Sequence, residues 1–407
     1  MDKKYLVVKK RKGLNKFVLP AFDIKIGTED VKIENSTGRY AAENIYASFD
    51  IPNFKKSLVD GFAVHSGDVR GASPSNPVPL KLKATLKIGE SYGDTLKKGE
   101  TVFVPTGGVV PKEADAVVMI EFCEIQGNEV FVYRDIAKNE NLIKAGDDIK
   151  KGVQILKIGE KITSEKIASL RAFGIKKLSV YRKIRIGIIS TGDELVDSGK
   201  AEFGKIYDIN GYTIFAESTK WNFIPRYYGI IRDDKNLIKE ALKKALSEND
   251  IVVMSGGTSK GSFDYTVSAI EELKNGKVLI HGLHLSPGKP TVIGVSERKL
   301  IAGLSGNPLA SFLVFKKVII PLVFEKCNLI YETREIFAEI TENVPSRKGR
   351  EEFIIGKLTL KNGKNTVKPL FSESAFSGIL AKGDGFIVVP LMSEGIKKGE
   401  KVKFELW

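Results

Sequence analysis

The sequence predicts a multidomain protein of the α/β plus β class. From about residue 184 to residue 326, strand-like apolar runs alternate with amphipathic helical segments, which is typical of a largely parallel sheet covered by helices. Short runs of alternating polarity, separated by Gly and Pro, precede and follow this stretch and indicate β-rich domains. The length of 407 residues suffices for roughly two to four domains.

Four domains are expected from these changes of pattern. They are a small helical linker domain formed by residues 1–54 with 149–180, a β-rich insertion domain (55–148), the α/β domain (181–328) and a C-terminal β-barrel (329–407). Acidic residues directly after Thr28 favour a helix over residues 28–37, capped by that threonine. A second helix is expected over residues 163–174, where apolar residues fall at helical spacing before Gly174.

The chain is strongly basic, with 64 Lys and Arg against 50 Asp and Glu and a formal net charge of +14. Such a surplus favours anionic ligands, either nucleic acid or a phosphorylated small molecule. The lysines are dispersed, however, and no run of five consecutive basic residues occurs, so we interpret most of the charge as a solvated surface. No RNP, KH or helix-turn-helix pattern is present, and nucleic-acid binding is not expected.

Cysteine usage and hydropathy indicate the compartment. The two cysteines, Cys123 and Cys327, form no CxxC pair, which excludes a zinc ribbon or a thioredoxin-type site and suits a reducing compartment. No apolar run approaches the ~18 residues of a membrane span, and the N-terminus lacks the long apolar region of a signal peptide. We therefore expect a cytoplasmic protein without a membrane partner.

Five loops of the α/β region are expected to share one rim. In open α/β sheets, ligands bind beyond the carboxyl ends of the strands, so the residues directly after each strand are the candidates. These loops are Thr-Gly-Asp-Glu at 191–194, Arg-Asp-Asp at 232–234, Ser-Gly-Gly-Thr-Ser-Lys-Gly at 255–261, Ser-Pro-Gly-Lys-Pro at 286–290 and Ser-Gly-Asn-Pro at 305–308. Together they collect glycines, carboxylates and a lysine.

This combination suits a phosphorylated ligand bound with a divalent cation. A glycine loop such as 255–261 lets backbone N–H groups approach a phosphate, although it matches neither the P-loop nor the dinucleotide pattern. Four carboxylates of the rim would repel a bare phosphate: Asp193, Glu194, Asp233 and Asp264. A bound Mg²⁺ would reconcile them, and Lys289 would supply positive charge for an oxyanion.

Simpler structural interpretations stay open for these residues. Asp233 and Asp234 can cap the helix that follows them, and Asp264 can cap its own helix. The Gly-Gly pair can be an ordinary turn, and the loop at 193–194 can be a solvated connection. The agreement of several loops on one rim favours the functional interpretation over each of these.

The same loops occur in the order and spacing of the MoeA/gephyrin E-domain family, the molybdopterin molybdenumtransferases, which this chain resembles from about Ile26 to its end. The matching segments are SLVDGFAV, VPTGGVVPKEADAVVMIE, IISTGDEL, IYDIN, GIIRDD, SGGTSKGSFDYT, SPGKP, GLSGNP, GREEF and SESAFSGILAKGDGFIVVP. The resemblance implies an elongated, four-domain homodimer with a MogA-like three-layer α/β domain. It also implies transfer of molybdate or tungstate to adenylyl-molybdopterin, with Mg²⁺ present and AMP released, and makes the upstream molybdopterin adenylyltransferase a candidate partner.

Carried over position by position, the resemblance assigns roles to individual residues. The catalytic set is Asp60, Glu194, Asp264 and Lys289. The set that binds adenylyl-molybdopterin and the oxyanion is Thr106, Thr191, Gly192, Asp233, Asp234, Ser255, Gly256, Gly257, Ser259, Pro287, Gly288, Asn307, Arg350 and Ser374. Asp193, Glu194 and Asp264 are expected to support Mg²⁺. In the family, the cleft lies between the α/β domain of one subunit and other domains of its partner.

The chain departs from the family pattern at positions that concern the oxyanion. Ser286 stands where the family usually has a lysine, and Ala310 stands where it usually has a serine. These changes remove two oxyanion donors and leave a second hypothesis open, a non-catalytic paralogue that binds molybdopterin or an oxyanion or acts as a scaffold. A third, molybdopterin adenylyltransferase, is disfavoured by the additional β-domains and by the SLVDGFAV motif.

Overall fold

The chain divides into two compact units. The computed structural model describes residues 9–11, 13–256, 262–361, 363–371 and 377–407. The first unit comprises Met1–Ala42, Ile158–Ile162 and Ser179–Trp407, and the second comprises Glu43–Lys157 and Thr163–Leu178. The first unit therefore contains the predicted α/β domain and barrel, and the second contains the β-rich insertion domain.

Six strands of the described chain form the sheet of the α/β domain. In spatial order they are β16 (Ile224–Ile231), β13 (Arg185–Thr191), β17 (Ile251–Gly256), β21 (Lys299–Ser305), β20 (Val292–Ser296) and β18 (Lys277–His281). The first four are mutually parallel, and β20 runs antiparallel to both of its neighbours. The prediction of a largely parallel sheet is confirmed.

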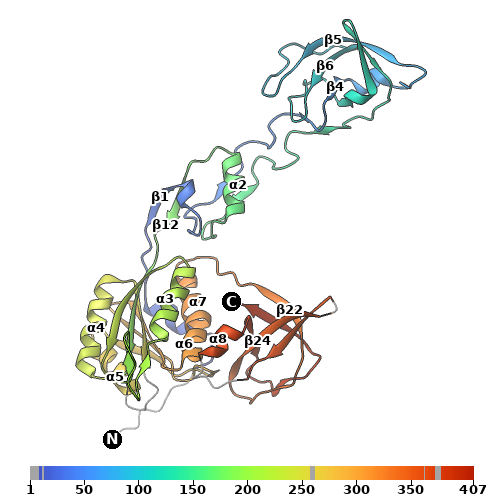
Figure 1. The fold of residues 1–407 in the computed structure, drawn as a ribbon. Coiled ribbons are helices and arrows are strands. Elements are labelled where there is room, and N and C mark those ends of the chain that lie inside the picture. The colour runs from blue at the N-terminus through green and yellow to red at the C-terminus, as the bar shows by residue number, and fades with distance from the viewer. Residues whose placement is uncertain (1–8, 12, 257–261, 362, 372–376) are drawn as a thin grey trace. The chain divides into compact units, whose positions relative to one another are not determined.

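Helices cover both faces of this sheet, which makes three layers (Figure 1). On one face lie α4 (Lys235–Glu248) and α5 (Ser262–Glu271), and on the other lie α3 (Asn210–Lys220), α6 (Pro308–Val314), a π-helical turn (Phe315–Ile319) and α7 (Ile320–Lys326). Successive residues of a strand point to opposite faces. Accordingly, Ile188 joins the core beneath α3, while Ile189 joins the separate core beneath α4.

The C-terminal residues form the closed β-barrel that the sequence predicts. Its strands are β22 (Glu335–Ile340), β24 (Glu351–Lys361), β25 (Lys364–Pro369), β26 (Gly385–Val389) and β28 (Lys401–Leu406). Because β24 pairs with both β25 and β26, the strand order closes on itself and leaves no free edge. Phe404 and Val367 are fully buried inside it.

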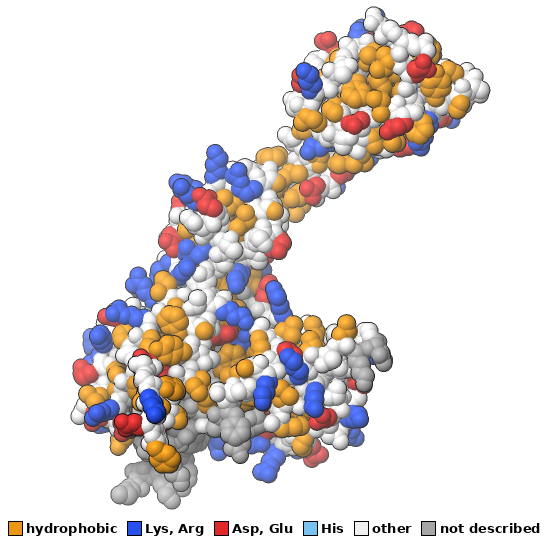
Figure 2. All heavy atoms as spheres, viewed as in Figure 1, with side chains coloured by type: hydrophobic (Ala, Val, Ile, Leu, Met, Phe, Trp, Pro, Cys, Tyr) orange, Lys and Arg blue, Asp and Glu red, His pale blue; other side chains and the backbone are white. Residues whose placement is uncertain are grey.

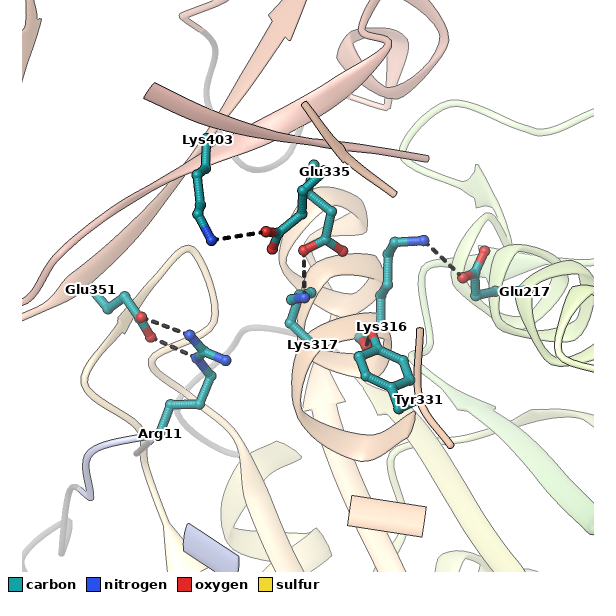
Figure 3. A network of polar contacts seen from close by, with 9 residues as sticks. Arg11, Glu217, Lys316, Lys317, Tyr331, Glu335, Glu351 and Lys403 are labelled. Carbon is teal, nitrogen blue, oxygen red and sulfur yellow. Dashed lines mark hydrogen bonds and ion pairs between the residues drawn. The ribbon is translucent and has the colours of Figure 1, made fainter. Parts of the chain in front are cut away.

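Buried ion pairs join the barrel to the α/β domain (Figure 3). Lys317, in the π-helical turn, contacts Glu405 of β28 at 2.6 Å, and both side chains are less than a tenth exposed. Burial lowers the pKa of Lys317, and the charge of Glu405 opposes that effect. Arg11 holds Glu351 of β24 through two hydrogen bonds of 2.7 Å. Removing one partner of such a pair would leave an uncompensated buried charge.

The second unit is built on another sheet. Its order is β7 (Ala116–Met119), β4 (Gly61–Val64), β6 (Glu100–Val104), β5 (Val78–Thr85), β9 (Glu129–Val132) and β8 (Cys123–Gln126). Phe62 and Val64 face one core, and Ala63 and Val102 face another. The same unit contains α2 (Ser164–Ala172), which confirms the helix predicted near residues 163–174, with Thr163 accepting a hydrogen bond from the Lys166 amide.

The helix expected over residues 28–37 is wrong. Residues Thr28–Lys32 form strand β1, which pairs with β12 (Lys177–Tyr181), and a short 3₁₀ turn follows at Ile33–Asn35. The strand gains its partner from a segment far along the chain, and Ile33 is buried. Tertiary pairing of this kind overrides a weak local preference for helix.

Surface features of the described residues agree with the interpretation of the charge. Figure 2 shows Lys and Arg side chains distributed over the visible faces and interspersed with Asp and Glu. None of the helices in the described ranges is long and apolar enough to cross a bilayer.

Candidate active site at the sheet edge

The carboxyl ends of the four parallel strands meet at one edge of the sheet. Thr191, which ends β13, lies opposite Ile231, which ends β16. Gly256, which ends β17, lies opposite Ser305, which ends β21. The loops that follow these strands therefore leave the sheet at one rim, as the sequence predicts.

Three carboxylates of the rim influence one another. Burial raises the pKa of Asp233, the charges of Glu194 and Asp193 raise it further, and a hydrogen bond from Thr191 lowers it. Its Oδ1 atom is buried and has no hydrogen-bond partner among the described residues. The backbone N–H of Asp233 donates to Asp193 Oδ1 at 3.4 Å. The rim thus concentrates negative charge around an oxygen that lacks a protein donor.

Asp234 has a different role from its neighbour. Its Oδ1 accepts hydrogen bonds from the backbone N–H groups of Asn236, at 2.8 Å, and Leu237, at 2.9 Å. Asp234 is therefore the N-cap of α4, and its carboxylate satisfies two of the helix's free donors. Asp233 is not the acceptor in these bonds, and the charges of Glu194 and Asp193 act on its carboxylate instead.

Two rim glycines lie close to side chains of the site. A Cβ atom on Gly256 would lie 2.4 Å from Oγ1 of Thr191. Gly192 has φ +151°, and a Cβ there would lie 2.8 Å from the carboxylate of Glu194. The carboxylate and the hydroxyl therefore occupy the space that a side chain would fill.

Beneath the rim lies a buried carboxylate to which the sequence interpretation assigned no role. Asp208, at 6% exposure, accepts hydrogen bonds at Oδ2 from Ser190 Oγ (2.5 Å) and Tyr227 OH (2.6 Å). Its Oδ1 accepts a hydrogen bond from the Gly211 N–H at 3.0 Å, in the first turn of α3. Burial and the hydrogen bond to Asp208 raise the pKa of Tyr227. The network ties β13, β16 and α3 together directly below residues 191–194.

A basic pocket lies where the α/β domain meets the barrel. The short strand β19 (Leu285–Ser286) pairs in parallel with the start of β24, which brings residues 286–290 beside residues 347–350. The pocket between them has a volume of about 630 Å³. It is lined by Ser286, Pro287, Gly288, Lys289, Ser305, Asn307, Ala310, Arg347, Lys348 and Arg350, among others. We call it the basic pocket.

Positive charge in the basic pocket is only partly neutralised. Arg350 forms an ion pair with the buried carboxylate of Glu352, but its Nε atom is buried without a hydrogen-bond partner among the described residues. Lys348 contacts Glu394 at 2.8 Å. Lys289 is exposed, and its ammonium group is available to a ligand from the solvent side. These groups suit a compact anion.

The loop that presents Lys289 is held by specific packing. Gly288 has φ +118°, and a Cβ there would lie 2.4 Å from Val314 Cγ2. Thr291 Oγ1 donates to the Gly288 carbonyl oxygen at 2.8 Å. On the opposite side of the pocket, Asn210 donates from Nδ2 to the Gly306 carbonyl oxygen at 2.8 Å. The pocket wall is therefore anchored to α3, which begins just after Asp208.

Asp60 and Thr106 come together in the second unit. The N–H and the hydroxyl of Thr106 both donate to Asp60 Oδ1, at 2.7 and 3.0 Å. Both residues are exposed. The next residue, Gly61, accepts no side chain, because a Cβ would lie 2.0 Å from the Val118 carbonyl oxygen. Two site residues that are 46 positions apart thus form one polar feature.

Some predicted site residues are not described. Gly257, Ser259 and Ser374 lie outside the described residues, and Asp264 belongs to α5 without a described side chain.

The chemistry of the described rim fits Mg²⁺ held jointly with a ligand. Mg²⁺ is usually bound by one or two carboxylates together with phosphate oxygens and water. The unpartnered Asp233 Oδ1 and the mutual repulsion of the carboxylates are features that a cation would relieve. Within the ranges that the structure describes, no group of three or more Asp, Glu, His or Cys side chains is placed to hold a metal ion.

Fold and site together define a multidomain protein with a basic pocket and a carboxylate rim at the edge of an α/β sheet. Three family models match consecutive parts of the chain: the MoeA N-terminal region (domain I and II) over residues 10–174, a probable molybdopterin binding domain over 187–325, and the MoeA C-terminal region (domain IV) over 338–407. The chain belongs to the MoeA family, whose proteins act in molybdenum cofactor biosynthesis.

Individual relatives agree with this assignment. A Methanocaldococcus jannaschii protein named for molybdopterin biosynthesis is 37% identical over 385 residues, covering 92% of this chain and 91% of the relative. A molybdopterin molybdenumtransferase from Staphylococcus aureus is 33% identical, covering 91% and 89%. The crystal structure of a molybdopterin biosynthesis MoeA protein from Pyrococcus horikoshii superposes with a TM-score of 0.81 at 34% identity, covering 98% and 99%.

Proposed function

We propose that this chain is a molybdopterin molybdenumtransferase, which inserts molybdate or tungstate into adenylyl-molybdopterin and releases AMP. The observation that carries the proposal is the presence, within one compact unit, of a carboxylate rim and a basic pocket on loops of the same sheet. The rim suits a diphosphate bound with Mg²⁺, and the pocket suits an oxyanion. Relatives named molybdenumtransferases support the same reaction.

The proposed reaction balances without an electron donor. Two Mo–S bonds form between the oxyanion and the dithiol of the substrate, while one Mo–O bond breaks and its oxygen leaves with the two thiol protons as water. One water is consumed when the phosphoanhydride bond breaks to give AMP and the terminal phosphate of molybdopterin. Molybdenum or tungsten keeps its oxidation state throughout.

The residues divide this work among three groups. Lys289 and Arg350 would hold the oxyanion through charge-assisted hydrogen bonds, with Asn307 nearby in the pocket wall. Thr191, Gly192, Ser255, Gly256 and Pro287 would position the rest of the substrate along the rim. Asp193, Glu194 and Asp264 would support Mg²⁺, which supplies charge stabilisation at the phosphoryl group when bound. Asp233 would add a further carboxylate oxygen beside them.

We further propose that the protein works as a cytoplasmic homodimer. The partner's Asp60 and the partner's Thr106 would then complete the site, as the family resemblance implies. The two free cysteines of the chain suit a reducing compartment. The upstream adenylyltransferase would deliver the adenylylated substrate. Sedimentation at micromolar concentration is expected to show a dimer, and a monomer would rule out a site shared between subunits.

AMP release tests the function directly. Purified protein is mixed with adenylyl-molybdopterin and Mg²⁺, with and without molybdate or tungstate, and AMP is quantified. Release that depends on one oxyanion supports the transferase and identifies its metal. Glu194→Ala is expected to abolish release while the fold is kept, whereas Glu202→Ala, an exposed glutamate in the same loop region, is expected to have no effect. Unchanged release in Glu194→Ala would contradict the role of that carboxylate.

A non-catalytic paralogue is the second candidate, and one observation favours it. Ser286 and Ala310, the two positions where oxyanion donors of the family are replaced, both line the basic pocket. A pocket with fewer donors could bind the substrate or oxyanion without turnover. Tight binding of adenylyl-molybdopterin without oxyanion-dependent AMP release would establish this alternative, and Ser286→Lys would then be expected to restore release.

A further inference from the structure

A second cavity adjoins the basic pocket on the side of the barrel. It has a volume of about 630 Å³ and shares Ser286, Pro287, Arg347 and Arg350 with the basic pocket. We call it the barrel pocket. Its size falls within the range of small-molecule sites, about 300–1,000 Å³. Because the two cavities share four lining residues, they lie side by side.

One wall of the barrel pocket is apolar. Phe353 and Ile379 are nearly completely buried, at 3% and 6% exposure, and belong to the main core of the unit. Phe371 lines the same pocket but leaves 58% of its surface exposed. An aromatic side chain that is exposed at a pocket is positioned to stack on a flat ligand, because aromatic faces gain from offset contacts.

The lining of the barrel pocket also includes residues with buried polar atoms that lack partners among the described residues. Arg350 Nε and Ser346 Oγ are both buried without a hydrogen-bond partner among the described residues. Glu352, at 5% exposure, lines the same cavity and is paired with Arg350. Leaving such atoms unpaired is costly, so a ligand with hydrogen-bonding atoms along one edge would satisfy them.

We propose that the barrel pocket binds the pterin ring system of adenylyl-molybdopterin while the basic pocket holds the oxyanion. This inference rests on the proposed function. A pterin is a flat fused heterocycle, with faces that suit Phe371 and Ile379 and a polar edge that suits Arg350 and Ser346. The dithiol that receives the metal is carried on a ring fused to the pterin, whereas adenine is separated from it by two phosphates. The pterin is therefore the ring that lies next to the oxyanion.

Substitution of Phe371 provides the test. Because this side chain is largely exposed, Phe371→Ala is expected to keep the thermal midpoint of the wild type. Binding is measured by fluorescence anisotropy with pterin-6-carboxylate as the probe, and tungstate affinity is measured by calorimetry on the same samples. We expect Phe371→Ala to weaken pterin binding about tenfold and Phe371→Trp to bind the pterin with nearly the affinity of the wild type. Tungstate affinity is expected to stay within about twofold of the wild type.

The matched control is Phe337→Ala, which removes an equally exposed phenylalanine, at 55% exposure, from β22 of the same barrel but outside both pockets. It is expected to leave both affinities unchanged. Equal pterin affinity in Phe371→Ala and the wild type would overturn the assignment of the pocket. So would a loss of AMP affinity in place of pterin affinity, which would assign the cavity to adenine.

The test separates failure of this inference from failure of the proposed function. If the wild type binds tungstate but not the pterin, the barrel pocket is not a pterin site while the oxyanion role of the basic pocket stands. If the wild type binds neither probe and AMP release is also absent, the proposed function itself fails. Parallel loss of pterin and tungstate affinity in Phe371→Ala would indicate a general structural effect and would also overturn the inference.

Discussion

Removing both hydroxyl donors to Asp208 is expected to destabilise the protein by more than the sum of the single changes. Ser190 Oγ and Tyr227 OH lie 2.5 and 2.6 Å from the same oxygen, Oδ2. In either single variant, Ser190→Ala or Tyr227→Phe, that oxygen keeps one donor. In the double variant it keeps neither of the two, and a carboxyl group with 6% exposure loses both of its hydroxyl donors.

The size of the effect follows from the contacts. A hydrogen bond to a charged group contributes about 1.5–3 kcal/mol to stability. When the acceptor oxygen keeps a second donor, the free energy lost with one bond lies toward the lower end of that range. Each single variant is therefore expected to lower the free energy of unfolding by about 1–2 kcal/mol. The double variant is expected to lose about 4–5 kcal/mol, which leaves a coupling energy of about 1–2 kcal/mol.

Tryptophan fluorescence during urea unfolding provides the measurement. The chain has two tryptophans, and Trp407→Phe leaves Trp221, at the end of α3, as the reporter of the α/β domain. As a control cycle, Ser190→Ala is combined with Ser296→Ala, which removes a hydroxyl that donates to the Lys274 carbonyl oxygen instead. That pair is expected to be additive. Additivity within about 0.5 kcal/mol for Ser190 and Tyr227 would refute the shared-acceptor reasoning.

Three further predictions concern the rim, the basic pocket and the thiols. Asp233→Asn is expected to raise the free energy of unfolding at pH 7 but not at pH 3. The pKa of Asp233 is raised in the folded state above the ordinary 3.8, so the protonated carboxyl favours the folded protein and this contribution is lost as the pH rises and the group ionises. An equal difference in stability between variant and wild type at both pH values would contradict this. Gly288→Ala is expected to lower the free energy of unfolding by about 1–3 kcal/mol, because its Cβ would lie 2.4 Å from Val314 Cγ2. It is also expected to weaken tungstate binding measured by calorimetry. A variant as stable as the wild type would refute the packing argument. Burial raises the pKa of the Cys327 thiol to about 12. Its reaction with a disulfide reagent at pH 8 is therefore expected to begin only when the protein unfolds. Labelling of the native protein at the rate of a free thiol would contradict this and show that the residue is accessible.

The predicted rim is the part of the site that local sequence patterns identify well. Each buried strand and the polar loop after it are contiguous in the chain, so hydrophobic periodicity locates both. Parallel pairing then places the carboxyl ends together, because each crossover connection brings the chain back to the amino edge of the sheet, so that every parallel strand ends at the same carboxyl edge. In the structure, Thr191 beside Ile231 and Gly256 beside Ser305 lie at this common edge.

The distinction between Asp233 and Asp234 needed the structure. Both residues follow β16, and either could cap α4 by its position in the sequence. In the structure, the Asp234 carboxylate accepts hydrogen bonds from the amides of Asn236 and Leu237, whereas the Asp233 carboxylate is influenced by the charge of Glu194. Such a choice depends on dihedral angles, which the order of residues does not reveal.

Local sequence patterns identify the strands and helices of the α/β domain, the β-barrel, and the loops that carry glycines and charges. Which distant segments meet depends on tertiary packing, which local patterns do not show. Asp208 reaches Ser190 and Tyr227 across 18 and 19 positions, and β19 pairs with β24, which assembles the basic pocket and the barrel pocket. Strand β1 replaced the expected helix over residues 28–37 for the same reason. Hydrogen bonds between distant segments release free energy that no local pattern records, and they override weak local preferences.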